Sequence, residues 1–165
     1  MFIGFVSDNA SGAHPRILEA LQRANTGYCM PYGDDEYCER AKAEFRKLFG
    51  DNIEVFFALS GTGCNVLSLR SALRPWQSVI CSDAAHINTA ESGAPEWTAG
   101  VKLLAVPSVN GKISPDSLDR YFPYITDCHH PTPHLVSITQ TTEKGAVYSP
   151  EEVRALFAAN GLPLL

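Results

Sequence analysis

The feature that most constrains this chain is a glycine-containing turn between an apolar run and a segment with helical spacing. The apolar run covers residues 53–59, is interrupted only by Glu54, and predicts a buried strand. The turn follows from Ser60 to Gly63, and apolar residues then recur at helical spacing, which predicts an amphipathic helix from about Thr62. The stretch therefore predicts a strand–turn–helix unit.

The same turn is a candidate anion site. The first N–H groups of a helix have no partner within the helix, and the helix dipole adds partial positive charge there. Gly61 and Gly63 leave no Cβ in the way of an anion, while Ser60 and Thr62 can add hydroxyl donors. An ordinary strand–helix turn with a threonine N-cap explains the spacing equally well. The turn is neither a Walker A loop nor a dinucleotide fingerprint, so other residues must identify its ligand.

Composition narrows the class of protein. At 165 residues, with 45% hydrophobic and 19% charged residues, the chain has the values of one globular domain with a sizeable core. Its formal net charge of −5 disfavours nucleic acid and anionic membrane as main partners, because both bind basic surfaces. The five cysteines include no Cys-x-x-Cys pair, which predicts reduced thiols in a cytoplasmic protein. No signal peptide or transmembrane segment is predicted.

The rest of the chain predicts alternating helices and strands. The predicted helices cover residues 15–24, 37–49, 115–121 and 150–159, and the predicted strands cover residues 79–81, 102–106 and 134–139, with another strand opening at Leu162. This alternation predicts an α/β fold with a mostly parallel sheet flanked by helices on both faces. Turns that follow parallel strands meet at one edge, so we expect residues 60–65, 83–88 and 140–145 to converge there.

Several motifs occur in a characteristic order along the chain. They are Ser-Asp-Asn at 7–9, Pro-Tyr-Gly-Asp-Asp at 31–35, Ser-Gly-Thr at 60–62, Ala-His-Ile-Asn at 85–88 followed by Glu91 and by residues 93–96, and the block at 136–145. Each motif alone has low specificity, but the ordered set resembles the low-specificity threonine aldolases. These enzymes belong to the aspartate-aminotransferase-like group that uses pyridoxal phosphate (PLP). The similarity covers this whole chain but only the N-terminal part of a full-length member.

The resemblance implies that residues 1–165 are an incomplete PLP-binding large domain without a C-terminal small domain. Residues 1–35 would form an N-terminal arm, a helix and an interface loop. Ser60, Gly61 and Thr62 would bind the cofactor phosphate, in agreement with the anion turn. His86 would lie flat over the pyridine ring, close to the substrate hydroxyl. Without the resemblance, His86 is equally well interpreted as a buried histidine satisfied by hydrogen bonds.

The resemblance also implies roles at the substrate. Ser7 would bind the substrate carboxylate, and Tyr32 would reach the active site of a neighbouring subunit in a homodimer or homotetramer. Glu91 and His129 would act near the substrate hydroxyl. From the residues alone, Ser7 is also a turn residue, Tyr32 an exposed loop tyrosine and Glu91 a solvated helix charge. No metal site is expected, because no regular element places His129 on one face with its neighbouring histidines.

The implied reaction is retro-aldol cleavage of threonine and other β-hydroxy-α-amino acids to glycine and an aldehyde, with PLP accepting the electrons of the broken bond. Two rivals stay open, namely another β-eliminating lyase of the same fold and a non-catalytic ligand-binding or assembly fragment. A serine hydrolase is disfavoured because Ser60 lies outside any Gly-x-Ser-x-Gly elbow.

The chemistry of the family also needs a Schiff-base lysine and an acid that faces the pyridinium nitrogen. In the family both follow the strand that here opens at Leu162. The lysines of this chain are Lys42, Lys47, Lys102, Lys112 and Lys144. Lys144 lies in a loop that could face the site, but no lysine of the chain matches that of the family. We therefore expect the sequence to be truncated and the chain alone to be inactive.

Overall fold

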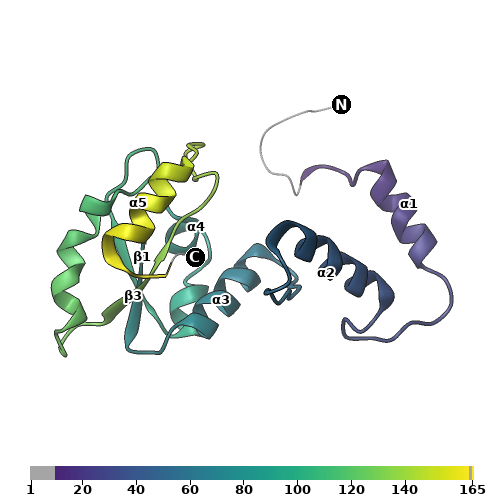
Figure 1. The fold of residues 1–165 in the computed structure, drawn as a ribbon, viewed down its shortest axis with the longest axis horizontal. Helices are drawn as coiled ribbons and strands as arrows, with labels where there is room; N and C mark the ends of the chain where they lie inside the picture. The colour runs from purple at the N-terminus through teal and green to yellow at the C-terminus, as the bar shows by residue number, and fades with distance from the viewer. Residues whose placement is uncertain (1–9, 164) are drawn as a thin grey trace. The chain divides into compact units, whose positions relative to one another are not determined.

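A computed structural model describes residues 10–163 and 165, and it divides the chain into two compact units, residues 1–56 and 57–165. Figure 1 shows the order of the helices and strands along the chain. Among the residues described, no helix is both long enough and apolar enough to cross a membrane.

The described part of the first unit contains two helices, α1 (Pro15–Ala24) and α2 (Glu36–Phe49), close to the predicted positions. Asp35 is the N-cap of α2, and its side chain accepts hydrogen bonds from the backbone N–H groups of Tyr37 and Cys38 at 2.9 Å each. Neither helix buries a side chain completely. Local capping signals therefore define these helices better than packing does.

The second unit contains a parallel sheet of three strands in the order β2-β1-β3. The strands are β1 (Gln77–Ser82), β2 (Lys102–Val106) and β3 (Thr132–Ser137). Beyond β3, the N–H of Leu165 donates to the carbonyl of Val136 at 2.8 Å. The strand predicted to open at Leu162 thus begins to pair with the outer edge of β3, and the predicted parallel sheet is confirmed.

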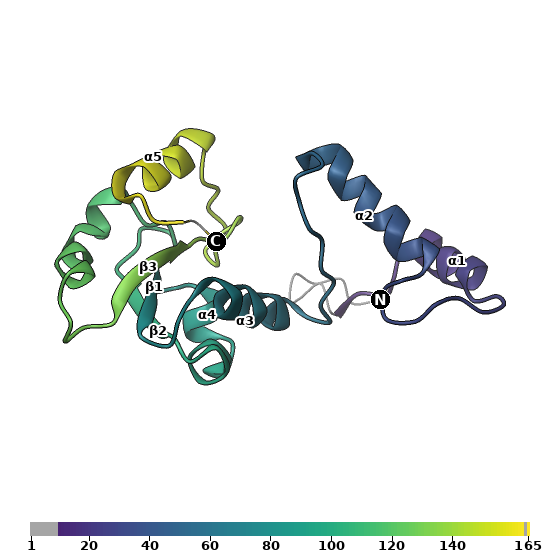
Figure 2. The same cartoon turned by 60° about the horizontal axis from the view of Figure 1, so that its bottom comes forward.

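Helices cover both faces of this sheet. The helical elements of the unit are α3 (Gly61–Ala72), α4 (His86–Thr89), the π-helix η2 (Pro95–Ala99), the 3-10 helices η3 (Pro115–Ser117) and η4 (Asp119–Ile125), and α5 (Pro150–Asn160). Val79 of β1 packs in one core cluster with Leu69 of α3, whereas Ile80 packs in a second cluster with Leu156 of α5. Figure 2 shows α5 and α3 on opposite sides of the strands. The predicted arrangement with helices on both faces is therefore confirmed.

The strand predicted over residues 53–59 is wrong. These residues form no strand, and the side chain of Phe56 is 88% exposed. The run crosses the boundary between the two units, and none of the described strands pairs with it. An apolar run supplies burial energy for a strand, but a strand also needs a neighbour that accepts and donates its backbone hydrogen bonds.

The helix predicted over residues 115–121 is replaced by the short 3-10 helices η3 and η4. The backbone N–H of Tyr121 donates to the carbonyl of Leu118, which is the spacing of a 3-10 helix. Pro123 lies inside η4 and has no N–H to donate, so a regular α-helix cannot continue through it.

Candidate functional site

The predicted anion turn forms the start of α3. Ser60 is the N-cap, and its Oγ accepts a hydrogen bond from the N–H of Gly63 at 3.1 Å. The helix begins at Gly61, and Thr62 is not the cap. Within the described part of the chain, no hydrogen bond involves the N–H groups of Gly61 and Thr62, and a Cβ placed on Gly61 would meet open space. Both donors are therefore available to an anion.

A buried carboxylate, that of Glu91, lies beside this helix. Glu91 is 4% exposed, so its interpretation as a solvated helix charge is wrong. Its Oε1 accepts a hydrogen bond from Nδ2 of Asn65 at 2.6 Å and lies 2.8 Å from Nδ1 of His86. Its Oε2 is buried without a hydrogen-bond partner among the described residues. Asn65, Glu91 and His86 thus form one polar cluster, the Glu91 cluster.

The chain path explains how residues of distant sequence position meet in the Glu91 cluster. Asn65 lies four residues after Gly61 on α3, which places it about 6 Å along the helix axis from the anion turn. His86 begins α4 shortly after the carboxyl end of β1. The chain then turns back through Ser92 and Gly93, whose φ angles are 53° and 71°. This reversal follows Glu91 directly, so Glu91 lies where α4 ends and faces α3.

The hydrogen bond to Glu91 defines the protonation of His86. A carboxylate oxygen only accepts hydrogen bonds, so Nδ1 of the neutral His86 ring carries the proton and Nε2 keeps its lone pair. The His86 side chain is 44% exposed, which contradicts the interpretation as a buried histidine. The ring is therefore oriented by a buried acid on one side and open to a ligand on the other.

Turns that follow β1 and β3 meet at the carboxyl edge of the sheet. Ser82, Ser137 and Thr142 line the same small recess there. Oδ1 of Asp83 accepts a hydrogen bond from Oγ of Ser108 at 2.6 Å, and this bond holds the pKa of the Asp83 carboxyl below its usual value. The expected convergence of residues 83–88 and 140–145 is confirmed.

Lys144 lines a second, more open recess at the same edge, together with Asp83 and Ser108. The loop that carries Lys144 is held by Thr142, which is buried and donates its hydroxyl proton to the carbonyl of Asn110 at 2.7 Å. The expectation that this loop faces the carboxyl edge is therefore confirmed. The anion turn differs from the turns after β1 and β3, because no strand directly precedes Ser60.

Three predicted site residues are not joined to the Glu91 cluster. Ser7 lies outside the described residues, and Tyr32 is a fully exposed residue of the first unit with a φ angle of 64°. His129 precedes β3 and so lies at the amino end of the sheet, whereas His86 follows the carboxyl end of β1. The length of the sheet separates the two histidines within this chain. The roles of Ser7, Tyr32 and His129 stay predictions.

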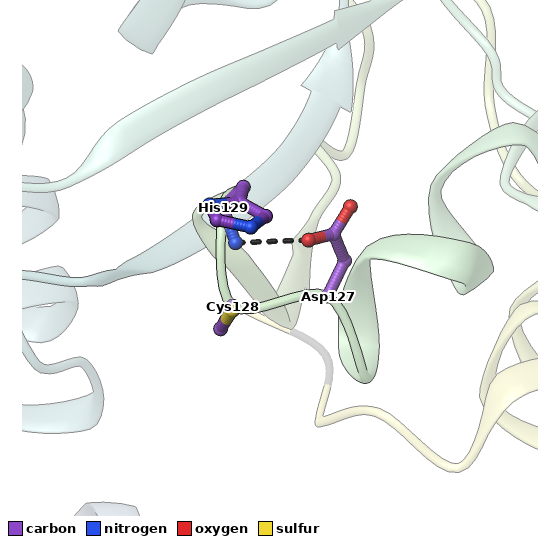
Figure 3. A group of neighbouring side chains, drawn as sticks. All are labelled: Asp127, Cys128 and His129. Atoms are coloured by element: carbon purple, nitrogen blue, oxygen red, sulfur yellow. Dashed lines mark hydrogen bonds between the residues drawn. The ribbon is translucent and has the colours of Figure 1, made fainter.

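Figure 3 shows a different group around His129, one that was not predicted from the sequence. Single ligand atoms of Asp127, Cys128 and His129 lie within 4.8 Å of one another. Asp127 accepts from the backbone N–H of His129 at 2.9 Å and bonds Nδ1 of His130 at 2.7 Å, and these bonds lower the pKa of the Asp127 carboxyl. Both carboxylate oxygens of Asp127 thus form hydrogen bonds within the turn, and the Cys128 thiol and the His129 imidazole are exposed.

Asn65 is a functional candidate that was not predicted from the sequence. The only sequence signal for it is a polar residue one helical turn after the predicted anion turn and one helical turn before the apolar Leu69. That position lies on the same face as the start of the helix.

Comparisons with known proteins agree with this geometry. The family model described as beta-eliminating lyase matches residues 4–164. The low-specificity L-threonine aldolase of Pseudomonas sp. (strain NCIMB 10558) is 46% identical over 93% of this chain and 45% of the relative's length. That of Pseudomonas aeruginosa is 44% identical over the same shares of the two chains. The chain thus spans about half the length of the curated relatives it matches.

Solved structures extend the comparison. The structure of Leishmania major threonine aldolase superposes with a TM-score of 0.91 and 34% identity, over 97% of this chain and 48% of that one. An archaeal alanine:glyoxylate aminotransferase superposes with a TM-score of 0.63 and 23% identity, over 91% of this chain and 40% of that one. The second likeness concerns the fold alone.

Proposed function

Because the chain belongs to the beta-eliminating lyase family, we propose that it is the first part of the PLP-binding large domain of a threonine aldolase. The complete enzyme would cleave threonine and other β-hydroxy-α-amino acids to glycine and an aldehyde. The observation that carries the proposal is the Glu91 cluster, which joins an open imidazole to the helix that begins with the anion turn. The names of the relatives and of the Leishmania structure support the substrate class.

The residues present fit the cofactor. The free N–H groups of Gly61 and Thr62, with the hydroxyl of Ser60 as cap, match the needs of a phosphate, and Gly61 leaves the approach open. The exposed ring of His86 can stack on an aromatic ring. When bound, PLP supplies an acceptor for the electrons of the broken Cα–Cβ bond.

His86 would act as the base of the reaction. Glu91 holds the proton of the ring at Nδ1, so the lone pair of Nε2 can accept the proton of the substrate hydroxyl. Loss of that proton lets the hydroxyl carbon become the carbonyl carbon of the leaving aldehyde. The buried Glu91 carboxylate then faces the imidazolium as its counter-ion, in the way that an acid supports the histidine of a catalytic triad.

Further parts of the proposal concern residues beyond the Glu91 cluster. Ser7 would bind the substrate carboxylate, Tyr32 would reach the neighbouring site of a homodimer or homotetramer, and His129 would approach the hydroxyl in the complete enzyme. The enzyme would work in the cytoplasm. The isolated chain would be inactive, because none of its lysines matches the Schiff-base lysine of the family.

The first test extends the reading frame past Leu165. In the family that the sequence resembles, the acid that faces the pyridinium nitrogen lies in an Asp-Gly-Ala-Arg segment just after the strand that opens at Leu162. A continuation into that segment with a later lysine supports the proposal, and a continuation without them contradicts it. The second test compares His86→Ala with Asn88→Ala in the protein so extended, because Asn88 lies on the same short helix and bonds the carbonyl of Asp83 instead. We expect His86→Ala to lower the rate of glycine release at least about a hundredfold and Asn88→Ala to change it little.

A different β-eliminating lyase is the second candidate, favoured by the description of the family model. A substrate panel separates the two, because only an aldolase releases glycine together with an aldehyde. Unchanged activity of His86→Ala on every substrate would instead favour a non-catalytic ligand-binding or assembly role.

A further inference from the structure

We propose that Asn65 is a positioning residue, which fixes the tautomer and orientation of His86 by holding Glu91. The inference rests on the proposed function, since it assigns to Asn65 the support of the proposed base. Asn65 touches Glu91 and makes no hydrogen bond to His86, so it acts through the carboxylate between them.

Glu91 depends on very few partners. Its side chain is fully buried, and Oε1 receives both hydrogen bonds, from Asn65 and from His86, whereas Oε2 has no partner among the described residues. A buried carboxylate without adequate hydrogen bonds costs free energy and tends to rotate or move toward other donors. Among the described residues, removal of the Asn65 amide leaves only the half-exposed imidazole of His86 as a hydrogen-bond partner of Glu91.

The position of Asn65 is itself rigid. Leu69 lies four residues later on α3, on the same face of the helix, and is completely buried in the core. The Asn65 amide is therefore presented from an element that packs against the sheet. Because α3 also begins with the N–H groups of the anion turn, one helix positions both the anion donors and, through Glu91, the ring of His86.

The structure offers a matched control. Asn88 is another asparagine of the same region, two residues after His86, and its Nδ2 donates to the carbonyl of Asp83 at 2.9 Å. It makes no hydrogen bond to Glu91. Asn88→Ala removes an amide close to the imidazole without removing a partner of the carboxylate.

The experiment measures the tautomer of His86 by ¹H–¹⁵N NMR of the 165-residue chain without cofactor. The pH is about 8.5, two units above the reference pKa of histidine, so that neutral rings are observed. We expect His86 of the unsubstituted chain to carry its proton on Nδ1. In Asn65→Leu the ratio of the Nδ1-protonated to the Nε2-protonated ring should fall about tenfold, the effect of losing one hydrogen bond to a charged group. Asn65→Gln keeps an amide and should restore most of the ratio, and Asn88→Ala should leave the ratio unchanged.

Two results would overturn the inference. One is a proton on Nε2 of His86 in the unsubstituted chain, and the other is an equal ratio in Asn65→Leu and Asn88→Ala. If Asn65→Leu does not fold, Asn65→Ser, which is small and too short to reach Glu91, takes its place, and the result for the unsubstituted chain stands in any case. Because the tautomer is read without cofactor or substrate, the inference can fail while the extended protein is an active aldolase, and it can hold while the extended protein is inactive.

Discussion

The two units of the chain differ in how their apolar residues are used. In the first unit, α1 and α2 carry apolar side chains at helical spacing, but none is fully buried, and Leu21 is 61% exposed. In the second unit, the apolar residues of β1 alternate between two clusters, and Leu69 of α3 is completely buried. The comparison shows that amphipathic spacing predicts a helix well, whereas burial depends on segments that are distant in sequence.

The largest expected effect concerns two cysteines, one in each unit. Burial raises the pKa of the Cys81 thiol in β1 to about 12, whereas a hydrogen bond with Asp35 is the main cause that raises the pKa of Cys38 in α2. The thiolate reacts with iodoacetamide, so three pKa units above the reference value should slow the labelling of Cys81 about a thousandfold, even before its burial is considered. Peptide mass spectrometry of the folded chain measures both rates.

Asp35→Asn is the matched control for the cysteines. It should speed the labelling of Cys38, since the acceptor charge is removed, and leave the rate of Cys81 unchanged. Equal rates for Cys38 and Cys81 in the folded chain would break the comparison, because they would show that β1 is no better protected than α2.

The second prediction concerns one leucine from each unit. Leu69→Ala should lower the free energy of unfolding of the second unit by about 3 kcal/mol, because it opens a cavity in a packed core. Leu21→Ala on α1 should change it by less than about 0.5 kcal/mol, because that side chain is mostly exposed. Urea denaturation followed by hydrogen exchange at β1 measures both variants. A cost at Leu21 as large as that at Leu69 would mean that α1 is covered in solution.

The sequence predicted most of the fold where local chemistry decides it. Ser149 and Glu152 form a reciprocal capping box at the start of α5, and Asp35 caps α2, so both helices begin close to their predicted positions. The three short strands also lie close to their predicted positions. Strands of a parallel sheet are buried on both faces, so short runs of β-branched and apolar residues indicate them well. The apolar run at 53–59 failed because its pairing depends on a distant neighbour.

The candidate site was predicted only in part. The anion turn followed from the residues, and the roles of His86 and Glu91 followed from the resemblance to a family. The hydrogen bond between Asn65 and Glu91 joins residues 26 positions apart, and no local pattern contains that contact. The same holds for the burial of Glu91, since its sequence neighbours Ala90 and Ser92 are small residues that occur equally in cores and on surfaces.

The smallest expected effect concerns two ion pairs, one in each unit. Nζ of Lys42 bonds Glu39 at 2.7 Å within α2, whereas Nζ of Lys112 bonds Glu152 of α5 at 2.6 Å, 40 residues along the chain. In each pair the hydrogen bond from the lysine is the main cause that lowers the pKa of the glutamate. A carboxyl group whose pKa is lower in the folded state stabilises the fold at pH values above its unfolded-state pKa, near 4.5. This contribution is lost as the pH falls through the folded-state pKa.

Acidification through this range should therefore weaken both pairs, but only the second joins separate segments. Glu152→Gln should lower the Tm of the second unit at pH 7 by no more than about 2 °C, since the Glu152 side chain is 45% exposed and its ion pair is partly screened by water. It should also reduce the loss of Tm on acidification. Glu39→Gln should speed amide exchange within α2 and leave that Tm unchanged. If the two substitutions lower the Tm of the second unit equally, the ion pair within α2 contributes to the stability of the second unit, and the expected difference between the two pairs is contradicted.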